Sequence, residues 1–194
     1  MNILFSAICV DSYKSFPTRS VLQGRKQELL SQWRYDEAVK EAEKAVELNP
    51  SGANARATLA FINLFKGDVN QSLKLFEIAL RLNPIPPSWF YHNFALALFL
   101  DGNYPEAISA CEECIVVAPK SFYPYLYKAA AYTSLNRDKD ADRAVKSLLK
   151  IYPSFSIKTA SKFTFRKTDD LNSLLDVLRK AGLTGDATIS ISIS

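Results

Sequence analysis

Apolar residues recur along this chain at the three- and four-residue spacing of amphipathic helices, and the pattern itself repeats. Four helical segments end alike, in AEKAVELNP, FEIALRLNP, CEECIVVAP and VKSLLKIYP. Their closing prolines, Pro50, Pro84, Pro119 and Pro153, are 34, 35 and 34 residues apart. A fixed period of this length predicts consecutive helix-turn-helix units that bury their apolar faces against one another.

Two other positions keep the same register and indicate where the helices of each unit meet. Twelve residues before each proline, where two helices must approach closely, stands a small residue: Ala38, Ser72, Ala107 or Ala141. Seventeen residues before each proline stands the expected turn: Trp33, Gly67, Gly102 or Asn136. Glycine and asparagine tolerate the left-handed conformation that ends a helix, so only Trp33 departs from turn chemistry.

In its period and in these positions, the segment 19–153 resembles the tetratricopeptide repeat family. The resemblance implies an all-α fold, a right-handed superhelical array of about four helix-turn-helix units. We place the units at residues 19–52, 53–87, 88–121 and 122–153, after an N-terminal arm or helix at residues 1–18. The first unit matches least well, because LQGRKQELL has helical apolar spacing but lacks the small-residue pattern.

The residues after Pro153 predict a C-terminal cap for the array, at residues 154–183. Its apolar positions follow helical spacing: Leu171, Leu174, Leu175 and Leu178. Thr168 or Asp169 can cap the start of this helix, and Gly182 follows its end. We expect the helix to cover the exposed end of the fourth unit, since repeat arrays need such caps. Residues 184–194, with the sequence TGDATISISIS, are expected to form a loose tail.

A second resemblance covers roughly residues 33–183. The stretch RLNPIPPSWFYHNFALALFLDGNYPEAI and the C-terminal segment are similar to the C-terminal repeat region of bacterial class III adenylate or guanylate cyclase-like proteins. The matching C-terminal positions are Pro153, Phe155, Ser156, Ile157, Phe165, Asp170 and residues 178–183. The few residues before the repeats do not hold a cyclase domain, so the resemblance implies a regulatory context without cyclase activity.

The C-x-x-C motif of Cys111 and Cys114 raises the question of a metal or redox site. In the repeat register both cysteines fall on the buried stripe of an outer helix, where a free cysteine packs as a small hydrophobic residue. A tetrahedral zinc site needs about four ligands, whereas the chain offers only Cys9 and the single His92 besides these two. We therefore predict a packing role for both sulfurs.

The sequence also lacks the motifs for calcium binding, phosphate binding and metalloprotease catalysis. The acidic stretch DKDADRA, at residues 138–144, lacks the glycine and the final glutamate of a calcium loop. The chain has no phosphate-binding glycine motif and no H-E-x-x-H metalloprotease motif. We predict no catalytic residue, no metal site and no cofactor, and hence a protein that is not an enzyme.

The amino-acid composition is that of a globular protein. Apolar residues make up 48% of the 194 residues and charged residues 23%, which is ordinary globular usage. Three cysteines do not form an even disulfide framework, and no apolar stretch approaches the ~18 residues of a membrane span. We expect a cytoplasmic protein without a membrane span.

The formal net charge of +4 is too small to indicate a nucleic-acid partner by itself. From residue 120 onward, however, 13 Lys and Arg stand against 7 Asp and Glu. Nucleic-acid binding is a remote alternative, through Lys146, Lys150, Lys158, Lys162, Arg166 and Lys167. A solvated helix face explains the interleaved charges more simply.

Stacked helix pairs form a concave groove that is lined by their inner helices. The repeat register predicts an aromatic groove with few charges. Its partner-binding residues are expected to be Asn54, Phe61, Phe65, Trp89, His92, Asn93, Leu96, Tyr123 and Tyr127. Tyr and Trp are suitable anchors because they bury a large area and keep a polar group.

These observations lead to a scaffold that binds a protein or peptide segment in its groove. Repeat proteins that clamp acidic chaperone tails hold carboxylates with Lys, Asn and Arg, and the corresponding residues here are Gln23, Gln27, Thr58, Trp89 and Asn93. Only Asn93 fits, so that class of partner is disfavoured. The alternative from the second resemblance is a regulatory module of a cyclase-like signalling system that lacks the catalytic domain.

Overall fold

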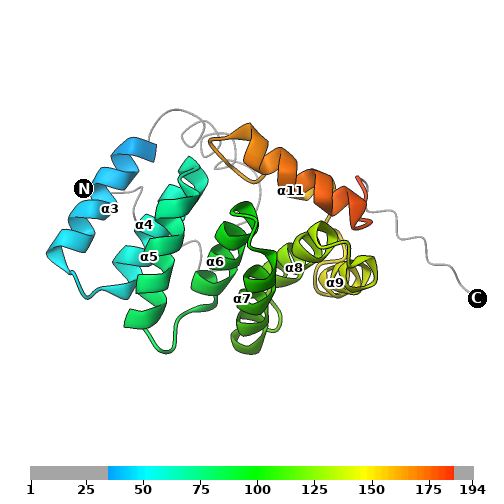
Figure 1. The fold of residues 1–194 in the computed structure, drawn as a ribbon, viewed down its shortest axis with the longest axis horizontal. Helices are drawn as coiled ribbons and strands as arrows, with labels where there is room; N and C mark the ends of the chain where they lie inside the picture. The colour runs from blue at the N-terminus through cyan, green and yellow to red at the C-terminus, as the bar shows by residue number, and fades with distance from the viewer. Residues whose placement is uncertain (1–34, 186–194) are drawn as a thin grey trace, which may run out of the picture.

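The computed structural model describes residues 35–185, which form nine helices and no strand (Figure 1). The helices are α3 (Tyr35–Leu48), α4 (Ala53–Lys66), α5 (Val69–Leu82), α6 (Ser88–Leu100), α7 (Tyr104–Val117), α8 (Tyr123–Ser134), α9 (Asp138–Ile151), α10 (Ile157–Ala160) and α11 (Thr168–Lys180). The predicted N-terminal arm, the first helix of the first unit and residues 186–194 of the predicted tail lie outside the described residues.

The helices pack as consecutive pairs. Helix α3 is the second helix of the first unit, and α4 with α5, α6 with α7, and α8 with α9 are three complete pairs. Successive pairs stack through α5 against α6 and α7 against α8. The all-α array predicted from the repeat period is therefore confirmed.

The turn between the two helices of each complete pair has the left-handed conformation predicted from its residue type. The φ angles of Gly67, Gly102 and Asn136 are 93°, 83° and 57°. The N–H of Gly67 donates to the carbonyl oxygens of Asn63 and Leu64 at 3.1 and 3.0 Å, which satisfies carbonyls that the helix end leaves free. Trp33, the residue that departs from this chemistry, lies outside the described residues.

Two hydrophobic clusters form the core. The N-terminal cluster joins α3 to α6 and consists of Ala42, Ala57, Leu59, Ala60, Ile62, Leu75, Phe76, Ala79 and Phe90. The larger C-terminal cluster runs from Leu64 through α6 to α9 and on to Phe155, Ile157, Leu174, Leu175, Leu178 and Leu183. Phe94 packs against both clusters, and its ring centroid lies 6.2 Å from that of Phe76.

Cys111 and Cys114 are free thiols that are fully buried in the helix packing. The equivalent residues of the neighbouring units, such as Phe76 and Leu148, are buried in the same way. Burial raises the pKa of the Cys114 thiol to about 12, and its Sγ donates to the carbonyl oxygen of Ser88 at 3.5 Å. Burial also raises the pKa of Cys111. Both sulfurs therefore stay protonated and fill space between helices.

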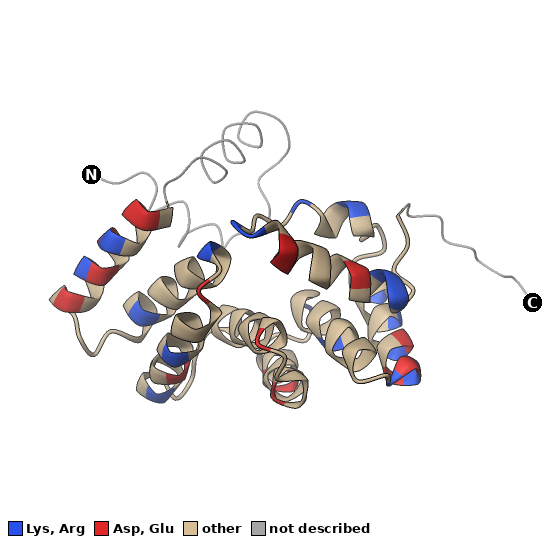
Figure 2. Cartoon of the chain, turned by 45° about the horizontal axis from the view of Figure 1, so that its top comes forward, with Lys and Arg blue, Asp and Glu red and all other residues tan. Residues whose placement is uncertain are grey.

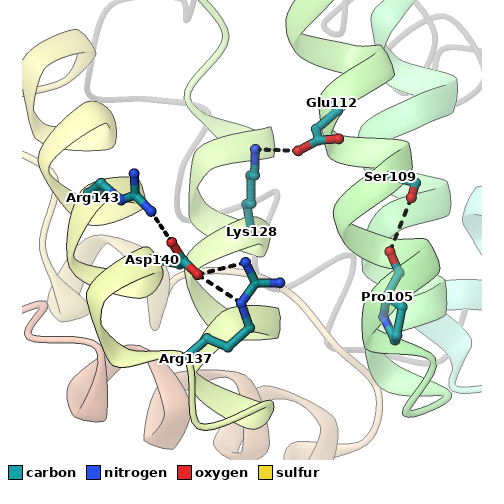
Figure 3. Close-up of polar contacts among 7 residues, drawn as sticks. All are labelled: Pro105, Ser109, Glu112, Lys128, Arg137, Asp140 and Arg143. Atoms are coloured by element: carbon teal, nitrogen blue, oxygen red, sulfur yellow. Dashed lines mark hydrogen bonds and ion pairs between the residues drawn. The ribbon is translucent and has the colours of Figure 1, made fainter.

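Charged residues are paired between neighbouring units and along the outer helices. Lys128 of α8 donates to Glu112 of α7 at 2.9 Å, and this ion pair links two units (Figure 3). Asp140 accepts from Arg137 at 2.7 Å and also contacts Arg143, which holds the pKa of its carboxyl below the usual range. The acidic stretch that superficially fits a calcium loop thus pairs with arginines at the start of α9.

Candidate protein-binding surface

The inner surface of the array is the face lined by α4, α6 and α8, the first helices of the three complete pairs. These helices begin at equivalent places of successive units, at Ala53, Ser88 and Tyr123. Side chains at matching positions therefore form rows across the array. The predicted groove residues fall on these three helices, but the structure gives them different environments.

Three of the predicted groove residues are buried within the array. Leu96 is fully buried and Tyr127 is 2% exposed, and both belong to the C-terminal cluster. Asn93 is also buried, and its side-chain amide donates to the carbonyl oxygen of Trp89 at 2.8 Å within α6. These three side chains offer a partner no accessible surface in this arrangement.

Two other predicted groove residues, Phe65 and Tyr123, are in contact with a C-terminal segment of the same chain. This segment, residues 163–167, is called the strap below. Its Phe163 ring lies 6.3 Å from the Tyr123 ring, and its Phe165 ring lies 4.9 Å from the Phe65 ring, measured between centroids. The strap therefore crosses the inner surface from the start of α8 to the end of α4.

At the end of α4 the strap bonds to the main chain. The N–H of Arg166 donates to the carbonyl oxygen of Phe65 at 2.8 Å. The Nζ of Lys167 donates to the carbonyl oxygen of Gly67 at 2.7 Å. A Cβ on Gly67 would lie 2.7 Å from the Cδ of Lys167, so the missing side chain of Gly67 leaves room for the lysine stem.

An acidic residue of the first unit also holds the strap. Asp36 of α3 accepts from Lys66 at 3.0 Å and from the guanidinium of Arg166 at 3.4 Å. The hydrogen bond from Lys66 is the main cause that lowers the pKa of the Asp36 carboxyl. The hydroxyl of Tyr35 donates to the carbonyl oxygen of Thr164 at 3.5 Å. Residues about 130 positions apart in the sequence therefore meet at this corner.

Helix α11 continues from the strap and crosses the helix pairs (Figure 1). It packs against α8, with Leu174 and Leu178 fully buried in the C-terminal cluster. A small cleft of about 270 Å³ remains between α11 and the turn from α6 to α7, lined in part by Gly102, Asp170 and Val177. The helix begins at Thr168, and no side chain caps its start. The expectation that Thr168 or Asp169 caps this helix is therefore wrong.

The remaining predicted residues form the open end of the inner surface: Asn54, Phe61, Trp89 and His92. Asn54 is exposed, whereas the other three are partly buried. Asn54 and Trp89 are each the second residue of their helix, so they occupy equivalent places in neighbouring units. The Trp89 ring lies edge-on to Phe90 at 4.4 Å and packs on the N-terminal cluster.

His92 belongs to an aromatic stack at the border of the open end. Its ring lies 4.5 Å from the Tyr123 ring, nearly parallel to it, and Tyr123 stacks in turn on Phe122 at 4.1 Å. Burial lowers the pKa of His92 to about 3, so the ring is neutral at physiological pH. Its Nδ1 is buried and has no hydrogen-bond partner among the described residues.

The repeat register predicts no strap residue on the inner surface. Phe163 was not singled out, and Phe165 entered only through a family resemblance. Arg166 and Lys167 were considered as nucleic-acid contacts, but here they bond to Asp36 and to the Gly67 carbonyl. The available signal is the pair of phenylalanines two positions apart, flanked by basic residues, in KFTFRK, a segment without helical apolar spacing.

None of the helices between residues 35 and 185 combines the length and the apolar character needed to span a membrane. Lys and Arg alternate with Asp and Glu along α3 and α9 rather than gathering on one face (Figure 2). Lys146, for example, pairs with Asp142 at 2.7 Å. The basic excess of the C-terminal third is thus partly neutralised within the fold.

Comparison with known proteins gives matches to repeat proteins. The tetratricopeptide repeat family matches residues 28–51, which lie within the first unit. Mitochondrial import receptor subunit TOM34 of Rattus norvegicus is 31% identical over 96 residues, which cover 46% of this chain and 31% of that protein. The same protein of Mus musculus matches equally well. The chain spans about a third of the length of these relatives.

Solved structures match over more of the chain. MamA has a TM-score of 0.61 at 16% identity, covering 84% of this chain and 94% of that structure. The TPR domain of Arabidopsis OM64 has a TM-score of 0.52 at 19% identity, covering 66% and 95%. YrrB, described as a TPR protein with an unusual peptide-binding site, has a TM-score of 0.56 at 16% identity, covering 92% and 90%. With the observed helix pairs and turns, these matches identify the fold of the chain as a tetratricopeptide-repeat array.

Proposed function

We propose that this chain is a non-catalytic scaffold that binds a protein segment on its inner surface, starting at the open end. The observation that carries the proposal is the pair formed by Asn54 and Trp89, at equivalent places of neighbouring units. Asn54 is exposed and Trp89 is only partly buried. An amide and an indole at equivalent positions of neighbouring inner helices suit a peptide, because one can bond to the main chain and the other can pack on an apolar side chain.

The relatives support a protein partner in general terms. YrrB is a protein of the same fold with a peptide-binding site, and TOM34 is an import receptor subunit. Both statements concern those proteins, and they support the proposal only through the shared fold. The inner surface of this chain already accommodates a non-helical peptide segment, its own strap, through main-chain and aromatic contacts.

The test begins with capture of a partner by the immobilised full-length chain and continues with affinity measurements on the captured protein. Trp89→Ala should weaken binding by about 2 kcal/mol or more, as expected for an aromatic anchor. Asn54→Arg, an exposed substitution that leaves the core intact, should block the same surface. Thermal melting of each variant checks that the fold is retained.

The matched control lies on the outer face of the array. Lys146→Glu with Lys150→Glu changes two exposed residues of α9 and should leave the affinity unchanged. Normal binding by the inner-surface variants together with loss in the α9 variant would contradict the proposal. It would move the function to the outer face, where a steep salt dependence would indicate a nucleic acid.

The cyclase-linked alternative stays a prediction from sequence resemblance. Several residues of that resemblance have packing and capping functions in the fold. Phe155 and Ile157 are buried in the C-terminal cluster, and the Ser156 hydroxyl accepts from the Thr159 N–H at 3.3 Å at the start of α10. No contact of the described residues favours regulation of a cyclase over general protein binding.

A further inference from the structure

We propose that the strap is an internal ligand of the inner surface, and that the partner is a protein segment with the same Phe-x-Phe-Arg-Lys pattern, which binds by displacing it. The inference rests on the proposed function, because it assumes that the inner surface binds protein segments. It adds the chemistry of the partner and the way in which access is regulated.

The main-chain contacts of the strap do not depend on its covalent connection to the array. Phe65 lies in the last turn of α4, where carbonyl groups have no partner within the helix. The N–H of Arg166 supplies a donor to the Phe65 carbonyl, and the Lys167 ammonium supplies one to the Gly67 carbonyl. Any extended segment with a lysine at the matching place can make the same two bonds.

The side chains of the strap define what such a segment must carry. Phe165 packs on Phe65, and Phe163 packs toward Tyr123, so two aromatic residues two positions apart meet two aromatic residues of the array. Arg166 then faces the Asp36 carboxylate. A segment that lacks either ring or the cation would lose a contact that the array offers.

The strap is held less deeply than the segments on either side of it. Phe163 and Phe165 are partly exposed, and Arg166 and Lys167 are exposed. Before the strap, Phe155 is 2% exposed and Ala160 is fully buried. After it, Leu174 and Leu178 are fully buried. The strap can therefore leave the inner surface while the two flanking anchors keep the C-terminal segment in place.

Tethering at both ends makes the strap a strong competitor. A tethered segment acts at an effective concentration in the millimolar range. A free segment with similar contacts consequently binds weakly to the closed array, in proportion to the fraction of molecules whose strap is released. Weakening the strap should raise the affinity for the partner without any change in the binding surface itself.

The experiment uses a fluorescent peptide with the sequence of residues 161–168, SKFTFRKT, and the full-length chain. The variant Phe165→Ala with Arg166→Ala removes two strap contacts but keeps Phe65, Gly67 and Asp36. We expect it to bind the peptide at least about tenfold more tightly than the unmodified chain does, measured by fluorescence anisotropy. The control peptide SKATAAKT should bind neither protein.

A chain variant away from the strap serves as the matched control. Arg179→Ala breaks the exposed pair of Arg179 with Asp176 on α11, at 2.6 Å, without touching the strap. It should bind the peptide as weakly as the unmodified chain. Thermal melting and circular dichroism check that all variants are folded.

A charge exchange keeps the proposal testable even if the strap variant does not fold. Asp36 is exposed, so Asp36→Arg changes the surface without disturbing the core. This variant repels Arg166 and should prefer the peptide SKFTFEKT, whereas the unmodified chain, which keeps the Asp36 carboxylate, should prefer SKFTFRKT. Binding that does not depend on the charge at Asp36 would place the peptide elsewhere and overturn the inference.

The outcomes separate this inference from the proposed function. Folded strap variants that bind the peptide no better than the unmodified chain overturn the internal-ligand inference, and a captured partner that still depends on Trp89 then leaves the proposed function standing. Peptide binding that follows the strap and Asp36 as expected supports the inference. If no captured partner depends on Asn54 or Trp89 in that case, the open end is excluded as the binding site while the strap site remains.

Discussion

The two hydrophobic clusters of the array are built differently. Within the described residues, the N-terminal cluster is assembled from the repeat helices α3 to α6 alone. The C-terminal cluster combines repeat helices with α10, α11 and the residues around them, which do not follow the repeat. One end of this array therefore shares its core with a segment that lies across the helix pairs, and the other end does not among the described residues.

The same C-terminal segment also covers part of the inner surface, at Phe65 and Tyr123. It supplies fully buried anchors to the core at Phe155, Leu174 and Leu178, and between them the shallow strap. One stretch of chain therefore contributes both to the C-terminal cluster and to the cover of the inner surface. The clusters also meet at Phe94, which packs against both, so the array is not two independent halves.

The largest effect should come from removing the C-terminal segment. Deletion of residues 154–194 strips Phe155, Ile157, Leu174, Leu175 and Leu178 from the C-terminal cluster, each worth at most about 1.5–3 kcal/mol of burial. The truncated chain should melt at a much lower temperature or aggregate. A chain shortened only by residues 187–194 is the control. Unchanged melting of the longer truncation in the monomeric state would show that the segment is not a cap.

A smaller loss of stability should follow from a Leu→Ala substitution that leaves a cavity in one of the two clusters. Leu174→Ala, at a fully buried position, should cost about 2–5 kcal/mol, and Leu75→Ala in the N-terminal cluster should cost a similar amount. Because the two sites lie in different clusters, their costs should add to within about 0.5 kcal/mol in the double variant, measured by denaturant unfolding. A larger deviation would show that the two sites are energetically coupled, with Phe94 as the neighbour common to both clusters. Leu171→Ala, a partly exposed site on α11, should cost less than Leu174→Ala.

The stability of the fold should depend on pH through His92, which lies at the border between the core and the open end. The folded-state pKa of His92 is about 3, below the ordinary value of about 6.5. The unfolded chain therefore binds the extra proton first, and stability falls as the pH drops below about 6.5, by about 1–2 kcal/mol down to pH 5. In the His92→Phe variant, the free energy of unfolding, measured with denaturant, should change less with pH over this range. Equal slopes would mean that the ring is solvated and already titrates normally.

The smallest effect should come from two glycines with the same backbone strain. Gly67→Ala and Gly102→Ala both force a side chain into the left-handed region, at a cost of about 1–2 kcal/mol. A Cβ at Gly67 also meets the Lys167 stem at 2.7 Å, whereas no atom lies within 4 Å of a Cβ at Gly102. Hydrogen exchange at the Arg166 amide should accelerate in the Gly67 variant only. Equal exchange in both variants would show that the lysine stem adapts without loosening the strap.

The repeat array itself could be predicted from the sequence with little loss. The prolines at a period of 34 to 35 residues, and the left-handed turns at Gly67, Gly102 and Asn136, follow from local chemistry. The packing of Cys111 and Cys114 follows from their register with buried residues of other units. Each of these features depends on a helix, a turn or the contact of neighbouring helices, and sequence periodicity reports all three.

The candidate site was predicted only in outline, because burial of one ring depends on which distant segment lies against it. The register placed Phe65 and Tyr123 on the inner surface, but it could not tell that Phe165 and Phe163 would lie against them. Leu96 and Tyr127 have the same spacing as open positions and are nevertheless enclosed by the stacked units. Periodicity fixes the face of a helix on which a residue lies, whereas only the tertiary structure decides what covers that face. For the strap, the decision rests on contacts between residues 100 and more positions apart, such as Lys167 with Gly67 and Arg166 with Asp36, which no local pattern encodes.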